Sequence, residues 1–165
     1  MDRCDMKVSR ILVVDDYKPW RRKICSMLKA KPELRIVAEC WNGADAVERA
    51  RALKPNLITM DIGIPQLNGI EAAVRVAEVS PSSKILFISE NTEPEVVSAA
   101  IDAGAFGYLH KMRVGTELLP AVTLIIQGGY FFSPYMERGT AYPEPTDSTE
   151  CQESTEMQMT HSPSY

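Results

Sequence analysis

The sequence predicts an α/β protein in which a doubly wound, five-stranded parallel sheet, in the order 2-1-3-4-5, lies between two layers formed by five helices. Two observations support this fold class. Short apolar runs of strand length alternate five times with segments of helical periodicity. The runs are nearly continuous and end at polar or turn residues, as in strands buried on both faces. Right-handed crossovers between such strands produce a three-layer sandwich.

The first two strand and helix pairs occupy residues 11–53. The first strand is the apolar run 11–14, and the helix after it starts near Pro19. The apolar stripe of this helix has the spacing i, i+4, i+7 and i+8: Trp20, Ile24, Met27 and Leu28. Residues 34–40 form the second strand, and Asn42 is an N-cap for the second helix. The predicted inner face of that helix is Ala46, Val47, Ala50 and Leu53.

The third unit begins with the strand 57–60 and continues through a loop to Asn68, which is the expected N-cap of the third helix. The predicted inner face of this helix is Ile70, Ala73, Val74 and Ala77. It ends at Ser80, because the residue before a proline avoids the helical region.

The last two units follow the apolar runs 85–88 and 106–109. Residues 92–95 match a capping box with Thr92 as N-cap and proline in the first turn, so the fourth helix starts there and runs to about Gly104. The fifth helix starts near Thr116 and stops at the two glycines 128 and 129. Its apolar positions are Leu118, Leu119, Val122 and Ile126.

The composition fits one globular domain followed by an acidic tail. The chain has 165 residues, of which 45% are hydrophobic and 24% charged. Residues 139–165 carry five acids and no Lys or Arg, and they are rich in Pro, Ser, Thr and Glu. Such a segment buries too little apolar surface to offset its ordering entropy. The predicted organisation is an N-terminal arm (1–7), the folded domain (8–128), an exit segment (129–138) and a disordered acidic tail (139–165).

Charge and hydropathy exclude several classes of protein. Residues 1–138 hold 18 basic and 17 acidic side chains, so the nearly neutral domain gives no reason to expect direct nucleic-acid binding. No apolar segment approaches the length of a membrane span, and the first residues lack a signal peptide, which predicts a cytoplasmic protein without membrane contact. The cysteines have no metal-binding spacing and are expected to be reduced thiols, with Cys25 and Cys40 packed in the core.

Five polar residues follow the predicted strands at their carboxyl ends: Asp15, Asp16, Asp61, Ser89 and Lys111. Ligands of open α/β sheets bind beyond these ends, where the strand order switches, so the five side chains should converge. Two or three carboxylates suit a divalent cation such as Mg²⁺, which removes the repulsion between a carboxylate and an incoming phosphoryl group. An ammonium and a hydroxyl can hold the phosphoryl oxygens. The pattern therefore predicts a site for Mg²⁺ and a phosphoryl group.

Four segments, residues 13–16, 60–69, 88–89 and 107–111, resemble the receiver domain of two-component response regulators. The resemblance covers roughly residues 8–128 and implies a flavodoxin-like fold. It also implies that the chain is a signalling switch that assists its own phosphorylation and dephosphorylation rather than a turnover enzyme.

The resemblance assigns a role to each residue of the site. Asp61 is the phosphoacceptor and, with Asp16, a direct Mg²⁺ ligand, whereas Asp15 acts mainly through water. The backbone carbonyl of Gly63 is a further ligand. The phosphoryl group is bound by Ser89 and Lys111, and the switch pair is Ser89 and Tyr108.

The implied phosphodonor is a histidine kinase or a phosphotransfer protein, and the implied output is an unidentified downstream protein or a homodimer that forms on phosphorylation. Residues 128–134 resemble the exit from receivers of LuxR-type regulators, which normally continue into a helix-turn-helix domain. The residues after Pro134 lack apolar periodicity and basic charge, so that domain is expected to be absent. The run Arg21-Arg22-Lys23 is either a solvated face or part of a kinase-docking surface.

Alternative functions are a pseudo-receiver that acts only as an interaction module, a truncated LuxR-type regulator, and a hydrolase of the haloacid dehalogenase type. The hydrolase is disfavoured because it needs a second acid where Gly63 stands. Three residues depart from the receiver pattern. Glu90 replaces a small residue, Ile64 replaces methionine, and Met112 replaces the proline after Lys111, for which a trans peptide bond or a strained loop is expected.

Overall fold

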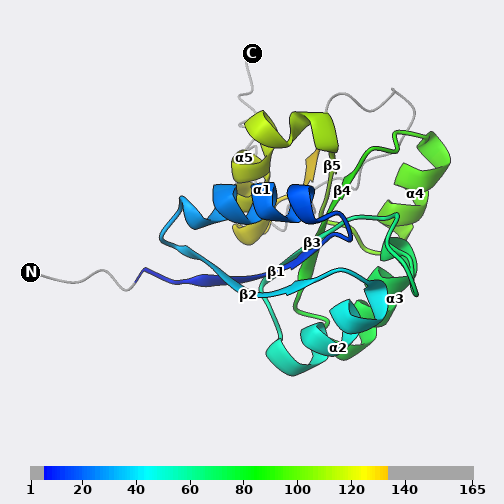
Figure 1. Ribbon diagram of the computed structural model, residues 1–165, viewed down its shortest axis with the longest axis horizontal. Helices are drawn as coiled ribbons and strands as arrows, with labels where there is room; N and C mark the ends of the chain where they lie inside the picture. The colour runs from blue at the N-terminus through cyan, green and yellow to red at the C-terminus, as the bar shows by residue number, and fades with distance from the viewer. Residues whose placement is uncertain (1–5, 134–165) are drawn as a thin grey trace, which may run out of the picture.

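The computed structural model describes residues 6–133 and has a single parallel sheet with helices on both faces (Figure 1). The strand order is β2-β1-β3-β4-β5-β6, so the predicted order 2-1-3-4-5 is confirmed and a sixth strand extends the sheet. The strands are β1 (Ser9–Val14), β2 (Leu34–Cys40), β3 (Leu57–Met60), β4 (Lys84–Ser89), β5 (Gly107–His110) and β6 (Phe131–Phe132).

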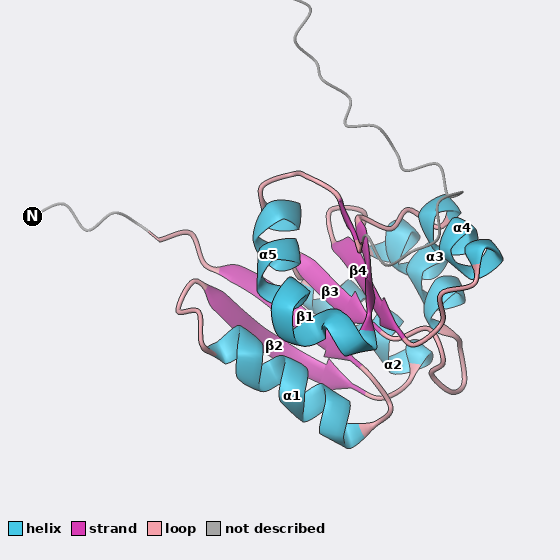
Figure 2. Ribbon diagram, turned by 90° about the horizontal axis from the view of Figure 1, so that it is seen from above, coloured by secondary structure: helices cyan, strands magenta, loops and turns pink. Residues whose placement is uncertain are grey.

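The helices cover the sheet in two layers, as Figure 2 shows. They are α1 (Lys18–Lys29), α2 (Gly43–Leu53), α3 (Gly69–Val79), α4 (Pro94–Asp102) and α5 (Val114–Ile126). One hydrophobic cluster joins α2, α3 and α4 to one face of the sheet, and a second joins α1 and α5 to the other. The predicted three-layer sandwich is therefore confirmed.

Alternation along β1 explains why its apolar run is continuous. Leu12 and Val14 belong to the cluster under α2 and α3, whereas Ile11 and Val13 belong to the cluster under α1 and α5. Successive side chains of a strand point to opposite faces, so a strand covered on both sides needs apolar residues at every position.

Two predicted N-caps are confirmed. The side chain of Asn42 accepts a hydrogen bond from the Asp45 N–H at 2.8 Å, and that of Asn68 accepts one from the Glu71 N–H at 2.9 Å. Each satisfies a backbone donor that the first helical turn leaves unpaired.

The predicted inner face of α3 was right for Ala73 and wrong for Val74 and Ala77. Its buried residues are Gly69, Ala72, Ala73 and Val76, whereas Val74 is 49% exposed and Ala77 is also exposed. The predicted stripe started from Ile70, which is only partly buried against the core cluster. The packed stripe starts instead from Gly69, one residue earlier and about 100° round the helix, because a residue without a side chain lets the helix approach the β3 end closely.

The starts of the last two helices also differ from prediction. The N-cap of α4 is Glu93 rather than Thr92, because Pro94 occupies the first helical position, where its missing N–H costs nothing. The Glu93 N–H donates to the side-chain oxygen Oδ1 of Asn91 at 2.8 Å. The helix α5 starts at Val114, two residues early, after a 3₁₀ turn over Lys111–Arg113.

Expectations about peptide bonds, cysteines and membrane spans can be compared with residues 6–133. All their peptide bonds are trans, including that between Lys111 and Met112. Cys25 and Cys40 are buried free thiols, as predicted. Within residues 6–133, no helix combines the length and apolarity that crossing a membrane requires. The acidic tail 139–165 and most of the arm 1–7 lie outside the described residues.

Candidate functional site

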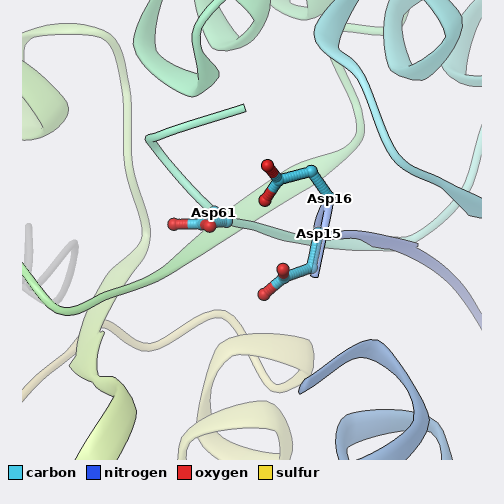
Figure 3. A group of neighbouring side chains, drawn as sticks. All are labelled: Asp15, Asp16 and Asp61. Carbon is cyan, nitrogen blue, oxygen red and sulfur yellow. The ribbon is translucent and has the colours of Figure 1, made fainter. Parts of the chain in front are cut away.

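Three carboxylates meet at the carboxyl ends of β1 and β3, where the strand order reverses (Figure 3). These strands are paired in parallel with Val14 beside Met60, so the residues that follow them, Asp15 and Asp61, emerge side by side. Oxygen atoms of Asp15, Asp16 and Asp61 all lie within 4.8 Å of one another. Such a switch point is where open α/β sheets bind ligands.

Lys111, at the end of β5, places its ammonium against this cluster. Its Nζ lies 3.1 Å from Oδ2 of Asp61 and 3.1 Å from Oδ2 of Asp15, and the contact with Asp61 also has hydrogen-bond geometry. The side chain is only 7% exposed and lies 5.6 Å from the centre of the Trp20 ring. Burial alone lowers the pKa of Lys111, but the charges of Asp61 and Asp15 outweigh it and raise the pKa above its ordinary value. Lys111 therefore remains an ammonium.

The two neighbouring aspartates differ in what they contact. Oδ1 of Asp15 accepts the Tyr17 N–H at 2.9 Å and its Oδ2 faces Lys111, so contacts within the protein use both oxygens. Burial raises the pKa of Asp15, and the Tyr17 hydrogen bond and Lys111 only partly oppose this effect. Asp16 leaves the chain on the opposite side and is exposed, and no hydrogen bond or ion pair joins its carboxylate to another described residue.

A guanidinium that the sequence did not assign to the site holds the backbone beneath it. Arg21 of α1 donates from Nη1 to the carbonyl oxygen of Asp15 at 2.8 Å and from Nε to Glu39 at 3.2 Å. Its carbon Cζ lies 5.8 Å from the centre of the Trp41 ring. Arg21 therefore links α1, β2 and the loop that presents Asp15 and Asp16. No sequence signal separates Arg21 from the exposed cations beside it.

Ser89 and Tyr108 lie together around the loop that follows β4. The Tyr108 side chain is fully buried, and its hydroxyl donates to the carbonyl oxygen of Asn91 at 2.6 Å. The Oγ of Ser89 accepts the Asn91 N–H at 3.1 Å. Burial raises the pKa of Tyr108, so the phenol remains a donor. Within the described residues, no hydrogen bond links Ser89 to Asp61 or to Lys111.

The loop after Asp61 depends on a close approach of backbone at Gly69. The Gly69 N–H donates to the carbonyl oxygen of Ile62 at 2.9 Å, and a Cβ at Gly69 would lie 2.2 Å from the carbonyl oxygen of Asp61. Gly63 is exposed in the same loop, and a Cβ there would meet nothing within 4 Å.

Of the three departures from the receiver pattern, Met112 and Glu90 are exposed and Ile64 is buried. Met112 is 84% exposed, and its N–H donates to Nδ1 of His110 at 3.2 Å, which helps to form the 3₁₀ turn without a proline. Glu90 is exposed immediately after Ser89, and Ile64 is buried with the core under α2 and α3.

The model of the response regulator receiver domain matches residues 11–123. The chain belongs to the response regulator receiver family. Members of this family are signalling modules of two-component systems, and the acidic cluster with its buried lysine is the arrangement expected in a receiver that accepts a phosphoryl group.

Relatives of this receiver include LuxR-type regulators. The transcriptional regulatory protein DegU of Brevibacillus brevis is 33% identical over 125 residues, which cover 76% of this chain and 53% of DegU. A protein-glutamate methylesterase/protein-glutamine glutaminase of Colwellia psychrerythraea is 41% identical over 103 residues, 62% of this chain and 27% of that enzyme. The chain therefore spans about half or less of these two relatives.

Solved structures support the same family. A LuxR-family response regulator from Aurantimonas sp. SI85-9A1 has 28% identity and a TM-score of 0.73, over 77% of this chain and 91% of that chain. The receiver domain of the putative response regulator NarL from Mycobacterium tuberculosis has 30% identity and a TM-score of 0.71, over 74% and 98% respectively.

Proposed function

We propose that the chain accepts a phosphoryl group on Asp61 from the phosphohistidine of a histidine kinase or phosphotransfer protein, with Mg²⁺ bound. The observation that carries this proposal is the buried ammonium of Lys111, 3.1 Å from Asp61, at the edge of a three-carboxylate cluster. A lone carboxylate at a strand end needs no such counter-charge. A carboxylate that receives a dianionic group does need it.

The side chains fit Mg²⁺, which prefers a few oxygen ligands and retains several waters. Asp16 and Asp61 would be the direct carboxylate ligands in this proposal, whereas Asp15 is fully buried and its Oδ1 accepts the Tyr17 N–H. Asp15 then acts through water, and the carbonyl of Gly63 supplies a further oxygen. Bound Mg²⁺ offsets the negative charge between Asp61 and the phosphoryl group.

In the transfer step, an Asp61 oxygen attacks phosphorus, a P–O bond forms, and the P–N bond to the donor histidine breaks. The imidazole leaves with the electron pair. Lys111 and Ser89 hold the phosphoryl oxygens as charge develops on them. In the later hydrolytic step, water attacks phosphorus and releases inorganic phosphate and the free carboxylate.

Phosphorylation then acts through Ser89 and Tyr108. When Ser89 turns toward the phosphoryl group, its hydrogen bond to Asn91 is lost, and the loop that also accepts from the Tyr108 hydroxyl rearranges. This loop leads into α4, so the change alters a partner-binding surface formed by α4, β5 and α5. The output partner in this proposal is a separate protein or a second copy of the chain, in the cytoplasm.

Intact-mass measurement after incubation with acetyl phosphate and Mg²⁺ tests the proposal. We expect the wild-type chain to gain one phosphoryl group and Asp61→Asn to gain none, because an amide cannot form the acyl phosphate. The matched control, Asp45→Asn on the exposed face of α2, should be labelled like the wild type. Label that persists in Asp61→Asn, or no label in the wild type, would overturn the proposal.

A further inference from the structure

A cationic groove runs along α1 beside the edge strand β2. It has a volume of about 430 Å³, and the side chains that define its charge are Lys18, Arg21, Arg22, Lys29 and Glu39. Four cations and one carboxylate give this groove a formal charge of +3. Glu39 pairs with Arg21 alone, and no carboxylate among the described residues forms an ion pair with Lys18, Arg22 or Lys29. The groove therefore presents three uncompensated cations.

These cations form a straight row. Lys18, Arg22 and Lys29 have the helical spacing i, i+4 and i+11, so they lie on one face of α1. At a rise of 1.5 Å per residue the row is about 16 Å long.

The acids of the C-terminal segment have a matching order. They stand at every third position, Glu144, Asp147, Glu150, Glu153 and Glu156, with no Lys or Arg among them. A chain of polyproline II conformation has three residues per turn, so a period of three places such carboxylates on one side at intervals of about 9 Å. Three successive acids then span about 18 Å, close to the length of the cationic row.

The segment can reach the groove within one molecule. The strands β2 and β6 are the two edges of the sheet, about 24 Å apart at the usual spacing of 4.8 Å between strands. Glu144 is 11 residues beyond Ser133, which an extended chain covers in up to about 36 Å, and each later acid reaches further.

We propose that the acidic segment 139–165 binds the cationic groove of its own chain, with its row of carboxylates along Lys18, Arg22 and Lys29. The contact is made by opposite charges and needs no apolar core in the segment. The bound segment lies against Arg21, whose Nη1 holds the Asp15 carbonyl, and therefore beside the acidic cluster. This docking does not depend on the proposed phosphorylation.

A spin label in the segment tests the contact in the full-length chain. Cys151 lies between Glu150 and Glu153, and Cys4→Ser leaves it as the reactive thiol. Cys25 and Cys40 are 4% and 2% exposed, and burial raises the pKa of each thiol to about 11, so both stay protonated and protected. Signal loss at each backbone amide is then measured by NMR.

We expect a loss of about twofold or more in the amide signals of Lys18–Lys29 at low ionic strength, and recovery in high salt as the charges are screened. Arg22→Gln with Lys29→Gln should abolish the loss. The matched control, Arg49→Gln with Arg51→Gln on α2, should retain it. The spectrum of each variant also reports whether the chain is folded.

Absence of signal loss at low salt, loss that survives Arg22→Gln with Lys29→Gln, or loss centred on another surface would overturn the proposal. Spin-labelled chain mixed with isotope-labelled chain separates binding within one molecule from binding between copies. Equal loss in this mixture would also overturn the proposal. None of these measurements requires phosphorylation, so their failure is distinguishable from failure of the proposed function.

Discussion

At the scale of residues, the sequence predicted which side chains converge but not what each one contacts. Apolar runs placed Asp15, Asp61 and Lys111 at strand ends, and parallel strands bring such ends together. The runs carried no information on rotamers, so the use of both Asp15 oxygens within the protein was not predictable. The contact between the Trp20 ring and Lys111 was not predicted either, because the sequence showed Trp20 only as one member of an apolar stripe.

Asp15→Asn should stabilise the metal-free chain at neutral pH. Because burial raises the folded-state pKa of Asp15 above 3.8, the folded state binds more protons than the unfolded state between the two pKa values. Stability therefore falls as pH rises through this window, by about 1.4 kcal/mol for each pH unit that separates the folded-state pKa from the unfolded-state pKa. Asparagine can still accept the Tyr17 N–H, and because its amide does not titrate, it removes this loss of stability with rising pH.

Urea unfolding of wild type and Asp15→Asn between pH 3.5 and 8, without metal, measures the difference. Asp102→Asn is the control, since Asp102 is exposed at the end of α4. Parallel pH profiles for wild type and Asp15→Asn would show that Asp15 is not penalised by burial.

Glu90→Gln should speed phosphorylation by small anionic donors. A like charge roughly 6–8 Å from the incoming anion opposes it by about 2–3 kcal/mol at a surface dielectric, and screening should reduce this to a threefold to tenfold rate effect. Rates with acetyl phosphate are compared across ionic strengths, with Glu95→Gln on α4 as control. Equal rates for Glu90→Gln and wild type at low salt would mean that Glu90 does not affect access.

At the scale of elements, asparagine caps predicted the starts of α2 and α3, whereas the buried face of α3 was predicted only in part. Asn42 and Asn68 act through hydrogen bonds within one turn, so their sequence context was sufficient. The buried face of α3 depends instead on how closely the helix approaches the end of β3. Gly69 makes that approach possible. The short distance between Gly69 and the carbonyl oxygen of Asp61 is visible only in the folded chain.

Gly69→Ala should destabilise the fold and disturb the phosphoacceptor loop together. Its Cβ would lie 2.2 Å from the carbonyl oxygen of Asp61, which forces backbone to move. Overpacking of this kind costs about 1–3 kcal/mol.

Gly115→Ala in α5 is the matched control for Gly69→Ala, since its Cβ would meet nothing within 4 Å, and it should stabilise by up to about 1 kcal/mol. Chemical unfolding together with the phosphorylation rate measures both effects. A Gly69→Ala chain as stable and as reactive as wild type would exclude a tight contact there.

At the scale of the whole molecule, right-handed crossovers and the strand-end pattern predicted the sheet order correctly. The strand β6 was missed because two residues, Phe131 and Phe132, carry no period of their own. It exists through tertiary pairing: the Phe131 N–H donates to the Phe106 carbonyl and the Ser133 N–H to the Tyr108 carbonyl, both at 3.0 Å. The sheet therefore includes residues 131 and 132.

A chain that ends at residue 129 should lose about 2–4 kcal/mol of stability, because it loses two backbone hydrogen bonds and the burial of two partly covered phenylalanines. A chain that ends at residue 138 keeps β6 and should unfold within about 0.5 kcal/mol of the full chain. Unfolding curves for the three lengths provide the comparison. Equal stability of the two shortened chains would show that β6 contributes nothing.

The proposed function depends on Asp61, and not a neighbouring aspartate, carrying the phosphoryl group. Borohydride reduces an acyl phosphate to an alcohol, which converts a phosphorylated aspartate into homoserine and leaves free aspartates unchanged. After incubation with acetyl phosphate and Mg²⁺, reduction and peptide mass spectrometry, we expect homoserine at position 61 and aspartate at positions 15 and 16. Homoserine at position 15 or 16, or none at position 61, would show that Asp61 is not the phosphoacceptor.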